Sequence, residues 1–539
     1  MSKEGLERRR FLKLASMGLA AGGFILCSRE GLAGMGGGMG CGGGCGGGMG
    51  GGVIDPPPGA TFMDPVAMPI TRSIEPINGI SRSVATANVR AMISQINVNG
   101  VTANLMTYNG YYPAPTITVR KGDVLRLNFT NALPSASTSE LNLLGHQRGF
   151  TNLHSHGWHV SPKAVRPDDN PPVYSDYVMY SLAPGGTVIH EYDTSREEAS
   201  GFHFYHPHLH GVSAEQYWAG MAGALITEDE LPVFSGIETH VMVLKDISLS
   251  GADPALHASM MDYMHGMEGN IIMVNGQVNP VLPVKPGQVQ RWRILNASNA
   301  RWYKLSLANH GMYLIGADGK LLDKPYAQSQ ILMSPGERVD ILVKASSSKA
   351  DYKFVSLPYS RMGMMSSAQV TLLTMRVTGS ATSGVIPAAI DPGAKRLTID
   401  TSPYPKYTLA LSMGQGRGYI NGISFVDMDN ACAITSTVGT DMMPSFEVWT
   451  VVNQSGMDHP FHQHVDHVQV LSITGADSSY PAYASMPARK DTVLIPKNGS
   501  AKLLVPIKDF DGMTMFHCHI LEHEDIGMMG VWDRMAMAM

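Results

Sequence analysis

The sequence predicts an all-β protein made of three β-sandwich domains. Glycine and proline are abundant, with 58 and 33 of the 539 residues, and many short Val/Ile/Leu runs end in turn residues. A strand-like segment with period-two alternation recurs three times, each time after a turn and each time ending on asparagine: residues 124–131, 289–296 and 446–453. The closing asparagines are 165 and then 157 residues apart, which suits three sandwiches of similar size.

Length, charge and cysteine content limit the class of protein further. A chain of 539 residues is too long for one domain. The net charge is −5, 16% of the residues are charged, and no basic stripe points to nucleic acid. Five cysteines do not make a disulfide framework. We therefore expect a globular protein without a nucleic-acid partner and without a disulfide scaffold.

The first 33 residues have the features of a twin-arginine export signal. Arginines at positions 8 to 10 are followed by Phe-Leu-Lys and then by an apolar run from Leu14 to Leu26. That run is too short to span a bilayer comfortably, and no later segment is long and apolar enough to do so. We expect a periplasmic or extracellular protein with no stable membrane span after signal removal. A lipid anchor on Cys27 is the alternative, although Leu26 is large for the residue before a lipidated cysteine.

A linker is expected between this signal and the first domain. Residues 34–52 are almost all glycine with methionine and cysteine interspersed, a composition that cannot form a packed core. Their sulfur atoms also suit Cu(I), so metal capture is a second interpretation. The expected domains cover residues 81–230, 231–380 and 405–539, with linkers at 34–80 and 381–404.

The stretch from Phe516 to Met528 concentrates metal-binding side chains. A cysteine, two histidines and a weak axial methionine form a blue-copper electron-transfer site, and Cys518, His523 and Met528 can supply three of these four ligands. On a strand, the flanking His517 and His519 point away from Cys518, where they can bind other metal ions. The cysteine would then be joined to a second metal centre by a few covalent bonds, which suits one-electron transfer.

Three further motifs carry closely spaced histidines: His154-Ser155-His156-Gly157, His206-Pro207-His208 and His459-Pro460-Phe461-His462-Gln463-His464. One His-x-His pair on a strand is often only surface or satisfied polar core. Four motifs in this order, spanning residues 154 to 528, are far more specific. Together they resemble the copper-binding motifs of the multicopper oxidases, the family of laccases and bacterial cuprous oxidases.

The resemblance implies cupredoxin-like Greek-key sandwiches and four copper ions. The type 1 copper would be held by His459, Cys518 and His523, with Met528 axial. The type 2 copper would take His154 and His462. The type 3 pair would take His156, His206 and His519 on one ion, and His208, His464 and His517 on the other. Since these residues lie in the first and third domains, the cluster is expected at their interface, with the second domain as a spacer.

Oxygen reduction also consumes protons, so carboxylates are expected near the cluster. Glu524 directly follows His523 and matches the acidic residue of the family at that position. The second acid of the family follows the His-Ser-His-Gly motif. Asp169 is the best candidate for it, and Asp168 is the alternative.

The implied function is an exported multicopper oxidase. It would couple one-electron oxidation of phenols, amines or Cu(I) at the type 1 copper to four-electron reduction of dioxygen to water at the trinuclear cluster, with copper tolerance as one physiological role. The alternative is a copper-binding or envelope scaffold protein on the same fold, because some relatives have lost their ligands. No ligand is missing from this sequence.

Two methionine clusters bear on the electron donor. The first consists of Met260, Met261, Met264, Met267 and Met273 with His257 and His265, and the second of Met362, Met364 and Met365. Methionines fill irregular cores by default, whereas their thioethers also prefer Cu(I). The methionine-rich segment of cuprous oxidases lies near the blue copper, but here the methionines lie in the second domain. The sequence leaves both interpretations open.

Overall fold

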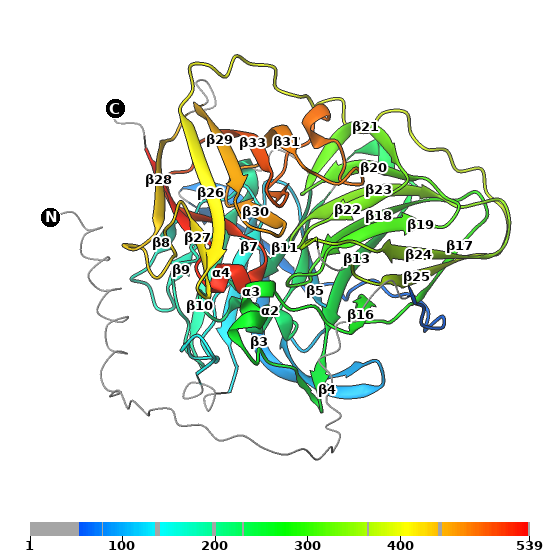
Figure 1. Ribbon diagram of the computed structural model, residues 1–539, viewed down its shortest axis with the longest axis horizontal. Helices are drawn as coiled ribbons and strands as arrows, with labels where there is room; N and C mark the ends of the chain where they lie inside the picture. Colours follow the sequence, from blue (N-terminus) through cyan, green and yellow to red (C-terminus); the bar gives the residue numbers. More distant parts are fainter. Residues whose placement is uncertain are drawn as a thin grey trace, which may run out of the picture. The chain divides into compact units, whose positions relative to one another are not determined.

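The computed structural model describes residues 53–77, 79–134, 141–196, 201–228, 231–363, 366–439 and 445–536. The expected export signal, and residues 34–52 of the expected linker, lie outside these residues. Strands predominate and the helices are short, so the all-β prediction is confirmed. Nearly all strands fall into three two-sheet sandwiches that follow one another along the chain (Figure 1).

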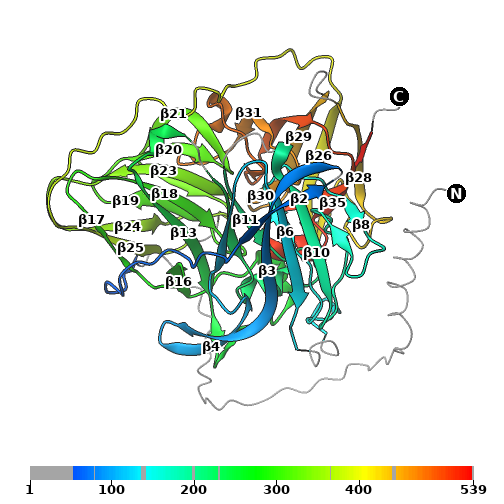
Figure 2. The same ribbon diagram turned by 180° about the vertical axis from the view of Figure 1, so that it is seen from behind.

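The first sandwich packs a seven-stranded sheet against a four-stranded one. Its strands are β2 (Thr71–Ile77), β3 (Ile80–Val98), β4 (Val101–Tyr108), β5 (Ala114–Val119), β6 (Val124–Asn131), β7 (His154–His156), β8 (Ala164–Arg166), β9 (Val173–Tyr174), β10 (Thr187–Asp193), β11 (Gly201–His206) and β12 (Gly223–Thr227). The larger sheet has the order β2-β3-β6-β10-β9-β8, with β4 on β3, and is seen well in Figure 2. The smaller sheet has the order β5-β12-β11-β7.

The second sandwich contains two six-stranded sheets. Its strands are β1 (Val53–Ile54), β13 (Glu238–Ile247), β16 (Ile271–Val274), β17 (Val281–Val284), β18 (Val289–Asn296), β19 (Tyr303–Leu307), β20 (Met312–Ala317), β21 (Lys320–Gln328), β22 (Ile331–Met333), β23 (Arg338–Lys344), β24 (Asp351–Leu357) and β25 (Gln369–Val377). One sheet has the order β16-β13-β18-β23-β20-β21, and the other β1-β25-β24-β19-β22 with β17 on β25. A two-stranded hairpin, β14 (Leu249–Ser250) and β15 (Asp253–Pro254), stands apart from both.

The third sandwich contains two five-stranded sheets. Its strands are β26 (Lys406–Gly414), β27 (Arg417–Ile420), β28 (Cys432–Thr437), β29 (Ser445–Asn453), β30 (His459–Gln463), β31 (Gln469–Thr474), β32 (Thr492–Ile495), β33 (Ser500–Ile507), β34 (Gly512–Cys518) and β35 (Met529–Met535). The sheet orders are β27-β26-β29-β33-β31 and β28-β35-β34-β30-β32.

The repeat predicted from the sequence corresponds to one strand in each sandwich. β6, β18 and β29 each lie between a parallel neighbour and an antiparallel neighbour. Each ends on a buried asparagine whose side-chain amide donates to two backbone carbonyls: Asn131, Asn296 and Asn453. The side-chain oxygen of each asparagine also accepts a hydrogen bond from the backbone amide two residues later, so the asparagine is part of the turn itself. The repeat prediction is confirmed.

Short helices lie where the three sandwiches meet. They are α2 (Ser213–Trp218), α3 (Met260–His265) and α4 (Leu521–Asp525). The chain also contains 3-10 turns at η3 (Thr194–Arg196), η4 (Pro232–Phe234) and η5 (Tyr483–Ser485). α2 and α3, from the first and second sandwiches, both pack on α4 of the third (Figure 1). The buried carboxylate of Asp525 accepts hydrogen bonds from the Gly211 and Ala214 amides at 2.7 and 2.8 Å. α4 is thereby held against the start of α2.

The two expected linkers differ in secondary structure: the described part of the first contains paired strands, whereas the second does not. Residues 53–77 were expected in a linker, but β1 pairs with β25 and β2 pairs with β3. Residues 378–405, by contrast, contain no helix or strand. Within the described parts of the chain, no helix has the length and apolar character needed to cross a bilayer.

Candidate metal centre

The face alternation of two strands separates the metal-binding residues into two groups. β30 and β34 are antiparallel neighbours, with His462 opposite His517 and Phe461 opposite Cys518. Successive residues of a strand point to opposite faces. Cys518 and His459 therefore share one face of this sheet, whereas His517 and His462 share the other.

The first group, here called the sulfur site, consists of His459, Cys518, His523 and Met528. Cys518 Sγ lies 3.4 Å from His459 Nδ1 and 3.5 Å from His523 Nδ1, and the two nitrogens are 3.2 Å apart. Donor atoms that share one metal at about 2.0–2.3 Å are separated by roughly 3–4 Å. All three side chains are fully buried. The spacing fits one metal ion held by two imidazoles and one thiolate.

Contacts on the far side of each ring fix its orientation. His459 Nε2 lies 2.7 Å from Ser455 Oγ, and His523 Nε2 lies 3.2 Å from the Met264 carbonyl oxygen. The Nδ1 atoms are thus left facing Cys518. Met528 is also buried, and its amide donates to the His523 carbonyl while its own carbonyl accepts from the Cys518 amide. These bonds hold Met528 beside the three other residues.

The second group, here called the imidazole cluster, comes from the ends of β7, β11, β30 and β34. Its members are His154, His156, His206, His208, His462, His464, His517 and His519, and all are buried. The His517 Nε2 atom lies 3.1 Å from His208 Nε2 and 3.4 Å from His464 Nε2. His206 Nε2 lies 3.4 Å from His156 Nδ1. The first and third sandwiches therefore contribute side chains to one shared site.

The imidazole cluster has the properties of a metal site rather than of a polar core. Among the described residues, His154 Nε2, His462 Nε2 and both ring nitrogens of His519 have no hydrogen-bond partner. Burial, with the neighbouring imidazoles, holds the pKa values of His154, His206 and His517 well below the usual range. Those three rings are thus neutral at pH 7, the form that binds metal. Buried donors without partners are costly unless a bound ion satisfies them, and imidazole suits copper.

One covalent path joins the two groups. Cys518 of the sulfur site lies between His517 and His519 of the imidazole cluster in the sequence. The Cys518 carbonyl also accepts a hydrogen bond from His517 Nδ1 at 3.0 Å, which turns the His517 Nε2 atom toward the cluster. The two candidate metal sites are therefore linked by a single peptide unit on each side of the cysteine.

Glu524 is the carboxylate that the structure brings to the imidazole cluster from α4. Its carboxyl oxygens lie 3.3 Å from His517 Nδ1 and 3.6 Å from His208 Nδ1, and the side chain is fully buried. Burial and the nearby Asp525 carboxylate hold the pKa of Glu524 well above its usual range. A carboxyl group that keeps its proton can donate it to a reacting group.

Neither Asp169 nor Asp168 lies at the cluster. Both are exposed, and Asp169 pairs with Arg166 at 3.0 Å on the surface. The buried carboxylate after the His-Ser-His-Gly motif is Asp176, which lies 2.9 Å from His154 Nδ1 and accepts from the Ser155 amide. Burial raises the pKa of Asp176 to about 6. The structure thus places Asp176, and neither Asp169 nor Asp168, beside the imidazole cluster.

The sequence carried a usable signal for Asp176. It is the only charged residue between Val173 and Leu182, whereas Asp168 and Asp169 lie in a hydrophilic Pro/Asp/Asn run that indicates an exposed loop. Asp491 was missed as well. Its Oδ1 lies 3.0 Å from His156 Nε2, and its backbone carbonyl lies 2.8 Å from His462 Nδ1. No motif singled this residue out.

The part of the first methionine cluster that lies in α3 is next to the sulfur site. α3 packs on α4, and the backbone carbonyl of Met264 is the contact of His523 Nε2. The side chains of Met260 and Met261 are 38% and 55% exposed, so they present thioethers to solvent at this place. In the second cluster, Met364 and Met365 lie outside the described residues.

Comparison with known proteins gives a consistent result. Three family models, each described as multicopper oxidase, match residues 91–231, 242–378 and 414–536. A multicopper oxidase of Staphylococcus aureus is 28% identical over 437 residues, covering 79% of this chain and 83% of that protein. A cell division protein, FtsP of Xenorhabdus nematophila, is 28% identical over 442 residues, covering 78% of this chain and 83% of its own.

A solved structure has the same fold. The multicopper oxidase from Campylobacter jejuni, described as a metallo-oxidase, superposes with a TM-score of 0.71 at 24% identity, over 89% of this chain and 96% of that one. This likeness agrees with the three sandwiches described above, and the prediction of cupredoxin-like domains is confirmed.

Proposed function

Because this chain belongs to the multicopper oxidase family, we propose that it oxidises an electron donor at a type 1 copper and reduces dioxygen to water at a trinuclear copper cluster. The balance is four electrons and four protons for each dioxygen and two water molecules. Four copper ions would accept electrons one at a time and supply all four to dioxygen. The observation that carries the proposal is the pairing of the sulfur site with an eight-histidine cluster, one peptide unit away.

The ligand assignment follows the resemblance of the four motifs to those of the family. We assign the type 1 copper to His459, Cys518, His523 and axial Met528. We assign the type 2 copper to His154 and His462, whose Nε2 atoms both lack partners among the described residues. We assign the type 3 pair to His156, His206 and His519 on one side, and to His208, His464 and His517 on the other. Close donor atoms within His208, His464 and His517, and between His156 and His206, support this division.

Two carboxyl groups are proposed to supply protons from opposite sides of the cluster. Glu524 contacts His208 and His517, the type 3 side, whereas Asp176 contacts His154, the type 2 side. Both are buried, and burial raises the pKa of each carboxyl group. A buried carboxyl group with a raised pKa can hold a proton near neutral pH and release it as negative charge develops nearby.

The position of α3 supports Cu(I) as one donor, beside phenols and amines. Thioethers are soft ligands that prefer Cu(I), and the exposed Met260 and Met261 lie on the helix that contacts His523. Oxidising Cu(I) outside the cytoplasm would suit a role in copper tolerance. The export signal expected in residues 1–33 supports a periplasmic or extracellular location.

Replacing Met260 and Met261 together by leucine is expected to lower kcat/KM for Cu(I) by about tenfold while phenol turnover changes less than twofold. Leucine keeps the apolar volume but removes the sulfur donor. Met63, which is 64% exposed on another segment, serves as the control for loss of a surface thioether. Equal losses for both donors, or none for Cu(I), would remove α3 as a Cu(I) entry point.

The alternative is a scaffold protein on the same fold; one relative, FtsP of Xenorhabdus nematophila, is named a cell division protein, but this chain retains all twelve proposed ligands. Copper analysis of protein loaded with Cu(II), together with its absorption spectrum and oxygen uptake, separates the two functions. We expect four copper ions per chain, an intense blue band and donor-dependent oxygen consumption. A colourless protein with little copper after loading would contradict the oxidase proposal.

A further inference from the structure

One loop of the second sandwich reaches the imidazole cluster, although that sandwich contributes none of the proposed ligands. The loop runs from Ser334 to Glu337, between β22 and β23, and Arg338 is the first residue of β23. Gly336 has a φ of 82°, and a Cβ atom at this position would lie 2.8 Å from His519 Nδ1. Only glycine fits both the left-handed backbone and this close approach. The loop therefore forms a wall of the cluster.

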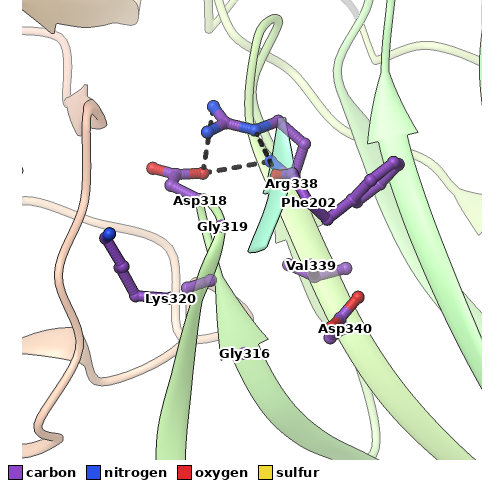
Figure 3. Close-up of a pocket in the computed structure, with 9 residues that line it drawn as sticks. Phe202, Gly316, Asp318, Gly319, Lys320, Arg338, Val339 and Asp340 are labelled. Carbon is purple, nitrogen blue, oxygen red and sulfur yellow. Dashed lines mark hydrogen bonds and ion pairs between the residues drawn. The ribbon is translucent and has the colours of Figure 1, made fainter. Parts of the chain in front are cut away.

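Arg338, directly after this loop, is fully buried and held on several sides. Its Nη1 and Nη2 atoms both donate to the carboxylate of Asp491, the first at 2.7 Å. Nε donates to the Phe202 carbonyl at 3.2 Å, and the backbone amide of Arg338 donates to Asp318 Oδ1 at 3.0 Å (Figure 3). A planar guanidinium paired with both carboxylate oxygens fixes direction as well as distance.

Asp491, in turn, contacts one proposed type 3 histidine, His156, and one proposed type 2 histidine, His462. Its Oδ1 lies 3.0 Å from His156 Nε2, which leaves His156 Nδ1 facing His206. Its backbone carbonyl accepts from His462 Nδ1 at 2.8 Å, which leaves His462 Nε2 without a partner among the described residues. The ring orientation of both histidines thus depends on where Asp491 is held.

Gly157, the last residue of the His-Ser-His-Gly motif, packs directly on this ion pair. Its φ is 87°, and a Cβ atom there would overlap Arg338 Nη2 and lie 2.5 Å from Asp491 Oδ2. The first sandwich therefore contacts the pair from one side, while Phe202 accepts a hydrogen bond from another. All three sandwiches meet at the Arg338–Asp491 pair.

We propose that Arg338 is a positioning residue for the trinuclear copper cluster. By holding Asp491, it keeps His156 and His462 in the orientation that presents Nδ1 of the first and Nε2 of the second to copper. Partners of metal-binding histidines set ring orientation and metal affinity. The second sandwich is therefore part of the oxygen-reducing centre and not only a spacer. This inference rests on the copper assignment proposed above.

The test compares Arg338→Gln with Arg291→Gln in the full-length, copper-loaded protein. Arg291 is also a buried arginine of the second sandwich, and it pairs with Asp340. Asp340 pairs with Arg291 and Arg293 and, unlike Asp491, with none of the proposed copper ligands among the described residues. The measurements are copper per chain after graded exposure to a chelator, the electron paramagnetic resonance spectrum of the type 2 copper, and the blue absorption band.

For Arg338→Gln we expect type 2 copper to be held about 10- to 100-fold more weakly, with altered resonance parameters and an unchanged blue band. Arg291→Gln is expected to match the wild type. Copper retention and a resonance spectrum like those of the wild type in Arg338→Gln, or equal losses in both variants, would overturn the inference.

If Arg338→Gln does not fold, the same measurements on Arg338→Lys test the inference, because lysine keeps the charge but cannot pair with both carboxylate oxygens. A weakened type 2 site in that variant supports the inference and an unchanged one overturns it. Wild-type protein that holds no copper would instead refute the oxidase proposal.

Discussion

Cys518→Ser is expected to abolish the intense blue band and donor-dependent oxygen uptake while the imidazole cluster still binds about three copper ions per chain. Cys518 Sγ is the soft donor between His459 and His523, and a hydroxyl group is a poor replacement for a thiolate on copper. His462 and His517 of the imidazole cluster lie on the opposite face of the sheet from Cys518, so the cluster keeps its partners. Copper analysis, absorption spectroscopy and oxygen uptake measure the three expected results.

The chain offers a matched control for this variant. Cys432 is also buried and unpaired, but it lies in β28 next to Asn421 and belongs to neither metal group. Cys432→Ser should keep both the colour and the turnover. His206→Ala should give the converse phenotype, a blue protein that does not reduce dioxygen. Full turnover in Cys518→Ser would exclude this cysteine from the electron route.

Glu524→Gln is expected to lower the rate of oxygen reduction by about 10²- to 10⁴-fold, the usual range for loss of a positioned proton donor. The substitution keeps shape and burial but removes the acidic proton beside His208 and His517. Reduction of the type 1 copper by the donor in the absence of dioxygen should be unchanged, because the Glu524 carboxyl group faces His208 and His517 of the imidazole cluster. Stopped-flow measurement of bleaching and recovery of the blue band separates the two half-reactions.

Glu522 provides the control within the same helix. It is equally buried, but its carboxylate accepts from Asn299 and lies 3.1 Å from His257 Nε2, away from the imidazole cluster. Glu522→Gln should leave reoxidation within a few-fold of the wild type. If both variants slow reoxidation equally, a general disturbance of α4 explains the lower rate, and the proposed role of Glu524 as a proton donor is contradicted.

Local pattern was sufficient for the strands and for the choice of metal-binding residues. The period-two segments ending at Asn131, Asn296 and Asn453 became equivalent strands because alternation and turn chemistry act over fewer than ten residues. The same alternation separates Cys518 from His517, so the division into two groups of donors follows from sequence spacing. The start of the first sandwich was placed too late, since β2 and β3 pair before residue 81.

Contacts between distant segments were decided only by the tertiary structure. The sequence pointed to Asp169, with Asp168 as the alternative, whereas the structure brings Asp176 to His154, because distance from a motif says little when an intervening loop is long. The backbone carbonyl of Met264 in α3 reaches His523 of the sulfur site although the two residues are 259 positions apart in the sequence. The Arg338–Asp491 pair likewise joins two sandwiches.

By itself, then, the sequence determined the all-β class, the threefold repeat and the copper-type donor set, because each of these depends only on residue types and on their spacing over a few positions. The folded chain decided which carboxylate faces the histidines, what covers the sulfur site and how the second sandwich reaches the cluster. Those features depend on how separate sandwiches pack against one another. Such packing produces no periodic pattern of residues within any one segment, so it cannot be predicted from local sequence.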